Sequence, residues 1–565
     1  MCGILLTEIN EDDMGMITEL IKNRGRDCFC VKQYKNFLLC SSVLSIRGCV
    51  SQPIENQNFI LMYNGEVYNN VESDTLFIKE IIDDSLKKIN IPLISSKIQD
   101  LEKNTKITIS EYNLSLEQVK ELVYLIYNRI NEFENEMSIV VCIDDYILFF
   151  KDDIGRKSLG LGKNKFFISS VKYDIEIDSS FLYIYRISSR EFFRFKKNSE
   201  LLKIFESRSK HIENILKNHK DDYNFLINHN KGEYSRNDTC SFYKNFINVQ
   251  HSTNLKHEEE CSPNSKDNDF KCSFALNKNP SIAFNFKGDD KSVNIFLKNL
   301  GNETKQSISH EDLKSISILD FLLKKAVKKR LIDEDLIVFF SGGIDSVLIT
   351  LYLHLTQNKE RQIYLINTAF EGSFDRKNGK LAYLALKQKF SARKFVFIEN
   401  NLCTEQIVKD KEIISNLISP KKGKMDFNLG VILFYSSKCA SKFGKISYLG
   451  SGADELFCGY NKYKNNGEFR SAMFFDLYTI SYHNISRDDR IISNNNIEAR
   501  LPFLDTEIIK FTLDLADSAF IFDEENKILL RRLLRFYGLE AISHVPKKAM
   551  QYGTGIFKYE KEIHK

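Results

Sequence analysis

The sequence lacks the features that mark a membrane protein or a nucleic-acid binder. No apolar run approaches the roughly 20 residues of a membrane helix. The longest, Ser138–Cys142 and Tyr146–Phe150, are separated by Asp144 and Asp145. The 80 basic residues nearly balance the 76 acidic ones, which leaves a formal net charge of +4. We therefore expect neither a membrane nor a nucleic acid as a partner.

Cysteine is present, but no disulfide or zinc pattern is visible. The 12 cysteines are scattered, and the one close pair, Cys28 and Cys30, does not have CxxC spacing. Reduced thiols are typical of the cytosol. The opening segment MCGILLTEINEDD has no basic leader and meets an acidic residue at Glu8, which argues against a secretory or transit peptide. We expect a cytoplasmic protein.

Composition divides the chain into three parts. Residues 1–205 carry short apolar and aromatic runs between Asn, Gly and Asp turns, which predicts a sheet-dominated domain. Helices are expected at Asp74–Lys87 and Leu114–Asn131, where apolar residues recur three and four apart. Residues 206–305 are too polar to build a core, so we predict a linker with a partly disordered insert. A short strand at Ser281–Phe286 is the alternative.

Residues 306–565 alternate helical segments with continuous apolar strands. An amphipathic helix is expected after Glu311, then a buried strand at Leu336–Phe340 and a helix from Val347. Further strands are expected at Ile363–Ile366, Lys394–Ile398 and Lys445–Leu449. This alternation predicts a doubly wound α/β domain with a parallel sheet.

The strongest chemical signal is SGGIDS, which follows the predicted strand and leads into the helix. Such a turn exposes a row of main-chain N–H groups, and Gly342 and Gly343 let phosphate oxygens approach closely. Ser341 and Ser346 add hydroxyl donors. Asp345 would repel phosphate, so we expect it to hold the Mg²⁺ that neutralises a triphosphate. A plain Gly-Gly turn is the alternative, but the full hexamer is more specific than that.

The hexamer resembles the signature of the pyrophosphate-loop ATPases, which split ATP into AMP and pyrophosphate. Further along, LGSGADELFCGY resembles the second metal-and-nucleotide motif of the asparagine synthetases. The resemblance implies that Gly452 contacts ATP and that Asp454 is the other Mg²⁺ ligand. It continues through Glu498–Asp505, EARLPFLD, to VPKKAMQYGTG, where Lys547 matches the lysine that steadies the departing pyrophosphate. Taken alone, Lys547 could equally be a surface lysine.

Cys2 is a candidate nucleophile. Removal of Met1 would expose its α-amine, whose pKa of about 8 suits it to take the thiol proton. A Met-Cys-Gly start could be accidental. However, RGRD, YNGE, Ser73-Asp74-Thr75 and DDIGRKSL follow in the order found in class II glutamine amidotransferases.

That resemblance implies an N-terminal αββα sandwich of the Ntn type. On the same basis, Asn64 and the Gly65 amide form an oxyanion hole, and Asp74 binds the α-amine of glutamine. An Asn-Gly pair also favours a hairpin turn, and both interpretations can hold together.

Apart from the insert, the chain resembles the asparagine synthetases, and in particular the divergent branch called asparagine synthetase domain-containing proteins. The resemblance implies an ATP-dependent glutamine amidotransferase that converts an acid, most simply aspartate, into its amide. Two positions depart from the family. Val43 stands where the authentic enzymes carry an arginine that clamps the glutamine carboxylate, and Ser451 stands where they carry a glutamate. Arg47, four strand residues beyond Val43, would lie about 13 Å away and could not substitute.

These departures leave alternatives open. Ser451 favours the same fold acting on another acid or amine, as β-lactam synthetase relatives do. Val43 and Ser451 together motivate a nucleotide-binding regulatory or scaffold protein without turnover. The expected cofactors are ATP and Mg²⁺. The expected partners are glutamine, an acidic small molecule and, as one option, a second copy in a homodimer.

Overall fold

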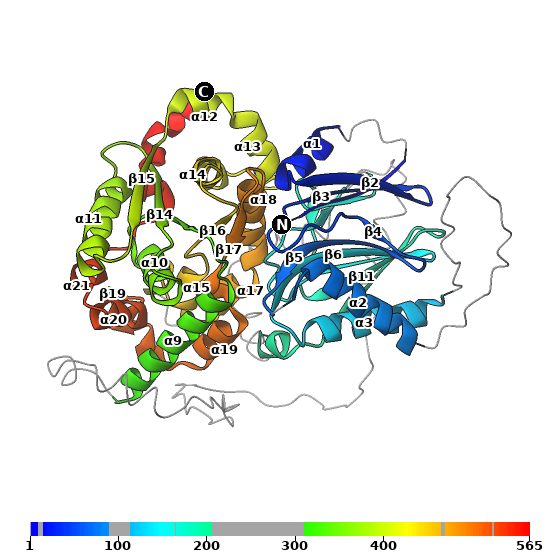
Figure 1. The fold of residues 1–565 in the computed structure, drawn as a ribbon, viewed down its shortest axis with the longest axis horizontal. Helices are drawn as coiled ribbons and strands as arrows, with labels where there is room; N and C mark the ends of the chain where they lie inside the picture. Colours follow the sequence, from blue (N-terminus) through cyan, green and yellow to red (C-terminus); the bar gives the residue numbers. More distant parts are fainter. Residues whose placement is uncertain are drawn as a thin grey trace, which may run out of the picture.

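The structure is a computed structural model that describes residues 2–9, 15–69, 71–89, 114–163, 165–205, 310–464, 469–522 and 525–564. They form two halves, and β1 begins near the boundary between them (Figure 1). The segment 206–305, with the alternative strand at 281–286, lies outside the described residues, as do residues 306–309 at the start of the third part. The three-part division of the chain stays a prediction.

The N-terminal half contains two six-stranded antiparallel sheets. One has the order β10-β8-β9-β1-β3-β2 and the other β12-β11-β7-β6-β5-β4. The strands of the first sheet are β1 Cys2–Glu8, β2 Cys28–Tyr34, β3 Phe37–Val43, β8 Gly160–Leu161, β9 Phe167–Ser169 and β10 Ile175–Glu176. Those of the second are β4 Ile54–Glu55, β5 Ile60–Val67, β6 Asn135–Ile143, β7 Tyr146–Lys151, β11 Phe181–Arg186 and β12 Glu191–Lys196.

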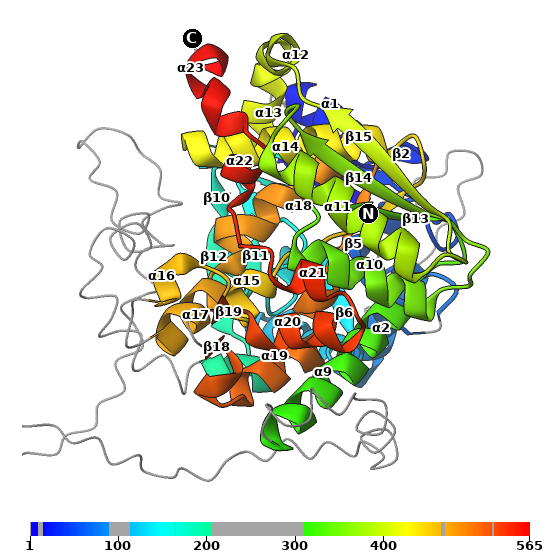
Figure 2. The same ribbon diagram turned by 90° about the vertical axis from the view of Figure 1, so that its left-hand side faces the viewer.

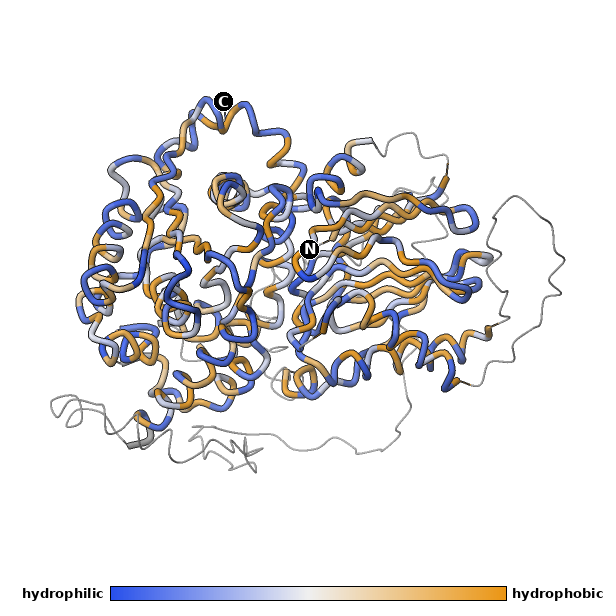
Figure 3. Tube along the Cα trace, in the orientation of Figure 1, coloured by the Kyte–Doolittle hydropathy of each residue, from blue (hydrophilic) through white to orange (hydrophobic). Residues whose placement is uncertain are grey.

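Alternating side chains explain the layers of this half. In β5, Ile60 and Met62 join the core between the sheets, whereas Leu61 and Tyr63 join the core beneath the helices. Helix α1 (Gly15–Arg24) packs on the first sheet, and α2 (Asp74–Lys88) and α3 (Leu116–Ile130) pack on the second. Hydrophobic segments follow the strands in Figure 3. The predicted αββα sandwich is confirmed, and α2 and α3 lie where helices were predicted.

The C-terminal half is built on a five-stranded parallel sheet in the order β15-β14-β13-β16-β17. The strands are β13 Leu336–Phe339, β14 Ile363–Ala369, β15 Phe395–Asn401, β16 Ile446–Tyr448 and β17 Glu498–Arg500. Adjacent β13 and β16 are separated in sequence by β14 and β15, so the strand order reverses between them. Ligands bind at such a switch point, beyond the carboxyl ends of the strands.

Helices cover this sheet, which confirms the doubly wound fold (Figures 1 and 2). Helix α10 begins before the predicted Val347, because Gly343 is its N-cap. No helix within the described residues is long and apolar enough to cross a membrane. The α-helices are α9 His310–Lys329, α10 Ile344–Thr356, α11 Phe374–Lys389, α12 Thr404–Lys409, α13 Lys411–Ile418, α14 Lys424–Ala440, α15 Ala453–Leu456, α16 Asn461–Lys464, α17 Phe469–Tyr478, α18 Ser486–Ser493, α19 Thr506–Asp514, α20 Ile528–Phe536, α21 Glu540–Ser543, α22 Met550–Gly553 and α23 Glu560–Ile563.

Short elements complete the C-terminal half. They are the hairpin strands β18 Ile521–Phe522 and β19 Glu525–Asn526, a π-helical turn at Ser481–Ile485, and 3₁₀ turns at Pro502–Leu504, Asp517–Ala519 and Ile556–Tyr559.

Buried ion pairs join the two halves. Arg24 of α1 lies 2.6 Å from the Asp489 carboxylate of α18. Arg330 lies 2.9 Å from Glu136 of β6 and 2.6 Å from Asp505. Both arginines are fully buried, so each carboxylate that faces them is needed to compensate a charge away from water.

The Arg24–Asp489 pair provides a stability test. Asp489 also accepts hydrogen bonds from the Ser158 N–H and Oγ, at 2.9 and 2.7 Å. Asp489→Asn keeps the shape but removes the carboxylate that faces the buried Arg24, so we expect the free energy of unfolding, measured with urea, to fall by about 3–5 kcal/mol.

The matched control is Glu19→Gln, which breaks the exposed Lys22–Glu19 pair of the same helix. We expect this control to cost less than about 1 kcal/mol. Equal effects of the two substitutions would show that the buried pair does not hold the halves together.

Candidate functional site

Cys2 lies at the start of β1, where it pairs with Val43, and it is buried. Its main-chain N–H donates to Asn64 Oδ1 at 2.9 Å, and its carbonyl accepts from Arg24 Nε at 3.0 Å. The Gln52 side-chain amide donates to its sulfur at 3.3 Å. Burial raises the pKa of the Cys2 thiol, and the Leu44 N–H and Arg24 oppose that shift. An adjacent base is therefore needed to form a thiolate.

Asn64 and Gly65 lie within β5, paired with Ser138 and Met137 of β6. The alternative interpretation as a hairpin turn therefore does not hold, because sheet pairing overrides the local preference of Asn-Gly. A Cβ at position 65 would lie 2.2 Å from the carbonyl oxygen of Glu136, so only glycine fits. The Asn64 carboxamide lies beside Cys2, as the oxyanion-hole prediction requires. Its Nδ2 faces Ser138 Oγ at 3.4 Å, so the role of the pair as oxyanion donors stays a prediction.

Asp74 is the first residue of α2, which Ser73 caps. Its Oδ1 accepts the Val67 N–H at 3.2 Å. Burial raises the pKa of Asp74, and the nearby Arg47 and the Val67 N–H oppose that shift. An anionic Asp74 therefore depends on cationic neighbours, which suits contact with an ammonium group.

Arg47 lies outside the strand on which the sequence estimate placed it. Strand β3 ends at Val43 and Arg47 lies in a bend, whereas its distance from Val43 stays a prediction. Instead, Arg47 Nη1 donates to the carbonyl oxygens of Val67 and Asn69, at 3.1 and 3.3 Å. Nη1 also lies 3.9 Å from Asp74 Oδ1. The turn therefore brings a cation beside the predicted amine-binding carboxylate.

The loop Ser341–Ser346 joins β13 to α10. Gly342 has φ of +79°, and a Cβ there would lie 2.7 Å from the backbone of Asn378, so the position requires glycine. Ser341 Oγ accepts the Gly343 N–H at 3.2 Å, and Ser346 Oγ donates to the Gly343 carbonyl at 3.0 Å. The loop has the strand-to-helix geometry that favours phosphate at a helix N-terminus.

The two aspartates predicted to hold magnesium converge on one lysine. Lys527 Nζ donates to both carboxylate oxygens of Asp345 at 2.7 Å and lies 2.5 Å from Asp454 Oδ1. Lys547 Nζ contacts Asp454 Oδ2 at 2.5 Å. Despite burial, these two ammonium groups hold the pKa of Asp454 well below its usual range. Although burial opposes its charge, Asp454 and Asp345 raise the pKa of Lys547.

Glycines allow this convergence. A Cβ at Gly450 would lie 2.6 Å from Asp345 Cβ, and one at Gly459 would lie 2.0 Å from Asp454 Oδ1. Gly452, the N-cap of α15, has φ of +92° and is backed by Leu504. The turn thus explains why position 452 is a glycine, and the contact of Gly452 with ATP stays a prediction.

The Asp345–Asp454 pair fits a magnesium ion. Both carboxylates face a single ammonium group, so the position between them accommodates a cation. Mg²⁺ prefers oxygen ligands and usually takes one or two carboxylates together with phosphate oxygens and water. In the part of the chain that the structure describes, no cluster of three or more His, Cys, Asp or Glu side chains could hold a metal. The pair therefore suits an ion that arrives with a nucleotide.

Sequence reasoning missed Lys527 and Asp375. Lys527 precedes α20, and KILLRR carries no sign that its side chain reaches Asp345 across 182 residues. Asp375, in the first turn of α11, is buried, and this burial raises its pKa to about 7 against the opposing charges of Lys547 and Lys548. A perturbed carboxyl near a lysine of the site is a common mark of function, but only the fold reveals it.

Ser451 lies in the turn between β16 and α15. The glutamate of the motif, Glu455, is buried and accepts hydrogen bonds from Tyr460 at 2.7 Å and Asn484 at 2.9 Å. Burial and Asp454 raise the pKa of Glu455 to about 7. Because Glu455 already accepts these two hydrogen bonds, it is a poor substitute for a glutamate at position 451.

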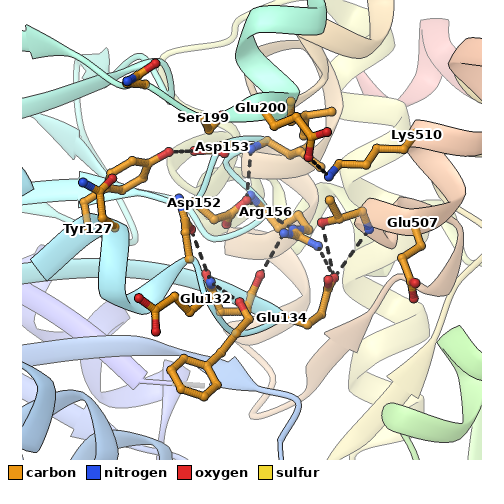
Figure 4. A pocket seen from close by; sticks show the side chains of 18 residues that line it. Tyr127, Glu132, Glu134, Asp152, Asp153, Arg156, Ser199, Glu200, Glu507 and Lys510 are labelled. Carbon is orange, nitrogen blue, oxygen red and sulfur yellow. Dashed lines mark hydrogen bonds and ion pairs between the residues drawn. The ribbon is translucent and has the colours of Figure 1, made fainter. Parts of the chain in front are cut away.

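A pocket of about 360 Å³ lies at the junction of the two halves (Figure 4). Arg156 lies 3.2 Å from Asp152 and 3.6 Å from Glu134, and its Nη1 donates to the Leu504 carbonyl at 3.0 Å. None of the predicted site residues lines this pocket. The DDIGRKSL motif at this point therefore serves the contact between the halves.

The sequence model of the asparagine synthase family matches residues 319–468 and 462–564. An asparagine synthetase domain-containing protein of Drosophila melanogaster is 24% identical over 98% of each chain. One of Saccharomyces cerevisiae is 30% identical, and the match covers 43% of this chain and 53% of the yeast protein, about half its length.

Among solved structures, a glutamine phosphoribosylpyrophosphate amidotransferase from B. subtilis has a TM-score of 0.26 and 11% identity. The match covers 72% of this chain and 92% of the other. This likeness is too slight to support a conclusion.

The fold and site define a protein that joins an αββα sandwich with a buried Cys2 to a parallel-sheet domain with a phosphate-type loop. Residues 319–564 of the chain are similar to the asparagine synthase family, whose sequence model matches them.

The raised pKa of Asp375 predicts a pH dependence. Between its ordinary pKa of 3.8 and about 7, the folded state keeps a proton that the unfolded state has lost. Stability therefore falls as the pH rises through this window. Asp375→Asn cannot ionise, so its free energy of unfolding relative to the unaltered protein should rise between pH 4 and 8, by up to about 4 kcal/mol.

Urea unfolding at several pH values measures this difference. Glu371→Gln, an exposed carboxyl nearby, is the control and should give a constant difference. A constant difference for Asp375→Asn as well would contradict the assignment.

Proposed function

We propose that the chain is an ATP-dependent glutamine amidotransferase of the asparagine synthetase type. It hydrolyses glutamine at Cys2 and adenylates a carboxylic acid, most simply aspartate, to form an amide, AMP and pyrophosphate. The observation that carries the proposal is the convergence of Asp345, Asp454 and Lys547 at the switch point of a family-typical sheet. The cytoplasmic location and the homodimer stay predictions.

Glutamine hydrolysis is assigned to the N-terminal half. Once Met1 is removed, the α-amine of Cys2 takes the thiol proton and the sulfur attacks the side-chain amide carbon. The carbon–nitrogen bond breaks, ammonia leaves, and water then cleaves the thioester to glutamate. Asn64 and the Gly65 N–H are assigned to the developing oxyanion. Asp74 is assigned to the α-ammonium group.

Acid activation is assigned to the C-terminal half. A carboxylate oxygen attacks the α-phosphorus of ATP, and the bond to the β-phosphate oxygen breaks to release pyrophosphate. Ammonia then attacks the acyl carbon, and AMP leaves. The main chain of Ser341–Ser346 would hold the phosphates, and Lys547 would neutralise the departing pyrophosphate.

Asp345 and Asp454 would hold magnesium. When bound, the ion neutralises charge on the triphosphate and so favours departure of pyrophosphate. Lys527, fully buried between the two carboxylates, compensates their charge in the ligand-free protein and would lie close to the phosphates.

Ser451 favours a second candidate function, in which the same half adenylates a different acid or uses a different amine. A serine cannot serve as a carboxylate base, and Glu455 is already hydrogen-bonded to Tyr460 and Asn484. Pyrophosphate release with another acid, and none with aspartate, would favour this candidate.

Replacement of Cys2 separates the two chemistries. Cys2→Ala should lower glutamate formation from glutamine by more than about 1000-fold, because the nucleophile is lost. Pyrophosphate formation with an ammonium salt should persist. Cys403→Ala, a thiol of the other half, is the control and should change neither rate. Loss of both activities in Cys2→Ala would contradict the division of roles.

Replacement of Asp345 tests the ATP site. Asp345→Asn should lower pyrophosphate release by at least about 100-fold, because one of the paired carboxylates is lost. Asp333→Asn, an exposed aspartate of the same half, should leave the rate unchanged. Unchanged pyrophosphate release in Asp345→Asn would refute the metal assignment.

A further inference from the structure

Arg47 and Asp74 form a charge pair near the Cys2 thiol. Arg47 Nη1 lies 3.9 Å from Asp74 Oδ1, and the side chains are 22% and 11% exposed. An α-amino acid carries an ammonium and a carboxylate on one carbon. A site for its charged end therefore needs an anion and a cation a few ångströms apart, and this pair provides both.

The guanidinium is held with one edge available. Nη1 donates to the carbonyl oxygens of Val67 and Asn69, which fixes the side chain. Among the described residues, none is seen to accept from Nε or Nη2 of Arg47. These two groups are parallel donors with the spacing that matches the two oxygens of a carboxylate.

Asp74 is adjacent in sequence to a residue that shares a hydrogen-bonding partner with the thiol. That residue is Thr75, whose Oγ1 accepts from Gln52 Nε2 at 3.2 Å. The same Gln52 nitrogen donates to Cys2 Sγ at 3.3 Å. An amino acid held at Arg47 and Asp74 would therefore extend its side chain along Gln52 toward Cys2.

A cationic pocket of about 670 Å³ opens at Arg47, lined also by Tyr68, Asn69 and Val71. Three lysines of α9, Lys325, Lys328 and Lys329, form its other wall. Lys325 and Lys329 are paired with Glu507 and Asp505, at 2.7 and 2.6 Å. These carboxylates offset two of the three lysines, so the pocket contributes an opening at Arg47, and the charge that favours a carboxylate is that of Arg47 itself.

We propose that Arg47 binds the α-carboxylate of glutamine and so supplies, from the turn after β3, the charge that Val43 lacks. This inference deepens the glutaminase proposal and rests on it. Asp74 takes the ammonium, and Arg47 determines specificity for a free α-carboxylate.

The test compares L-glutamine with its α-methyl ester, which lacks the carboxylate charge. For Arg47→Met, kcat/KM with glutamine should fall about 10- to 100-fold, mainly through KM, as for lost charge-assisted hydrogen bonds. The value for the ester should change little. Arg47→Lys keeps the charge without the paired donors and should be intermediate. Arg190→Met, an exposed arginine of the same half, is the control.

An equal fall for both substrates would mean that Arg47 only supports the fold, which would overturn the inference. If the unaltered protein hydrolyses no glutamine, the glutaminase proposal fails, and calorimetry with Cys2→Ala then tests Arg47 separately. If Cys2→Ala binds glutamine and the double variant with Arg47→Met does not, the inference is supported. If Cys2→Ala binds no glutamine, or if the double variant binds it equally well, the inference is overturned.

Discussion

Arg24 is the contact on which the arrangement of both halves depends. Its fully buried guanidinium donates to the Cys2 carbonyl, to the Ser170 carbonyl at 3.1 Å and to Asp489 across the boundary at 2.6 Å. One side chain thus fixes the start of β1 and docks α18 on the sandwich. Because a buried charge without a partner is costly, the position of the candidate nucleophile and the contact between the halves are energetically linked.

Another buried arginine lies at the edge of the parallel sheet. Arg500 of β17 lies 3.5 Å from Glu66, which follows Gly65, and its Nε donates to Glu498 at 2.8 Å. Burial and Glu498 raise the pKa of Glu66 to about 8, against the opposing charge of Arg500. The C-terminal half thereby sets the charge of a group beside the candidate oxyanion hole.

The region around Glu66 is polar and incompletely paired. Within the described residues, several buried atoms make no hydrogen bond, namely Tyr63 Oη, Glu66 Oε2, Tyr68 Oη, Glu136 Oε2 and Arg500 Nη2. Buried polar groups of this kind are normally bridged by ordered water. The boundary between the halves therefore contains charged and polar groups as well as apolar packing.

Local patterns predicted the fold where local forces determine it. The apolar strands and SGGIDS follow from residues adjacent in sequence, and Gly342 needs its positive φ whatever surrounds it. The alternative of a hairpin turn at Asn64-Gly65 does not hold, because pairing with β6 outweighs the local turn preference. Arg47 does not continue along the strand, because β3 ends at Val43. Lys527 reaches Asp345 only through the tertiary fold, and no local pattern marks it. The αββα arrangement itself was expected from family resemblance, since the alternation of apolar residues alone predicts sheets but not their stacking.

The central claim is that glutamine hydrolysis and ATP cleavage serve one reaction in one chain. The most direct measurement supplies the unaltered protein with ATP, Mg²⁺, glutamine and one carboxylic acid at a time from a panel that includes aspartate. Glutamate and pyrophosphate are counted in the same sample. The account predicts that, with the correct acid, the two products form in equal amounts. If none of the acids in the panel supports pyrophosphate release, even when ammonium is supplied, the account is contradicted.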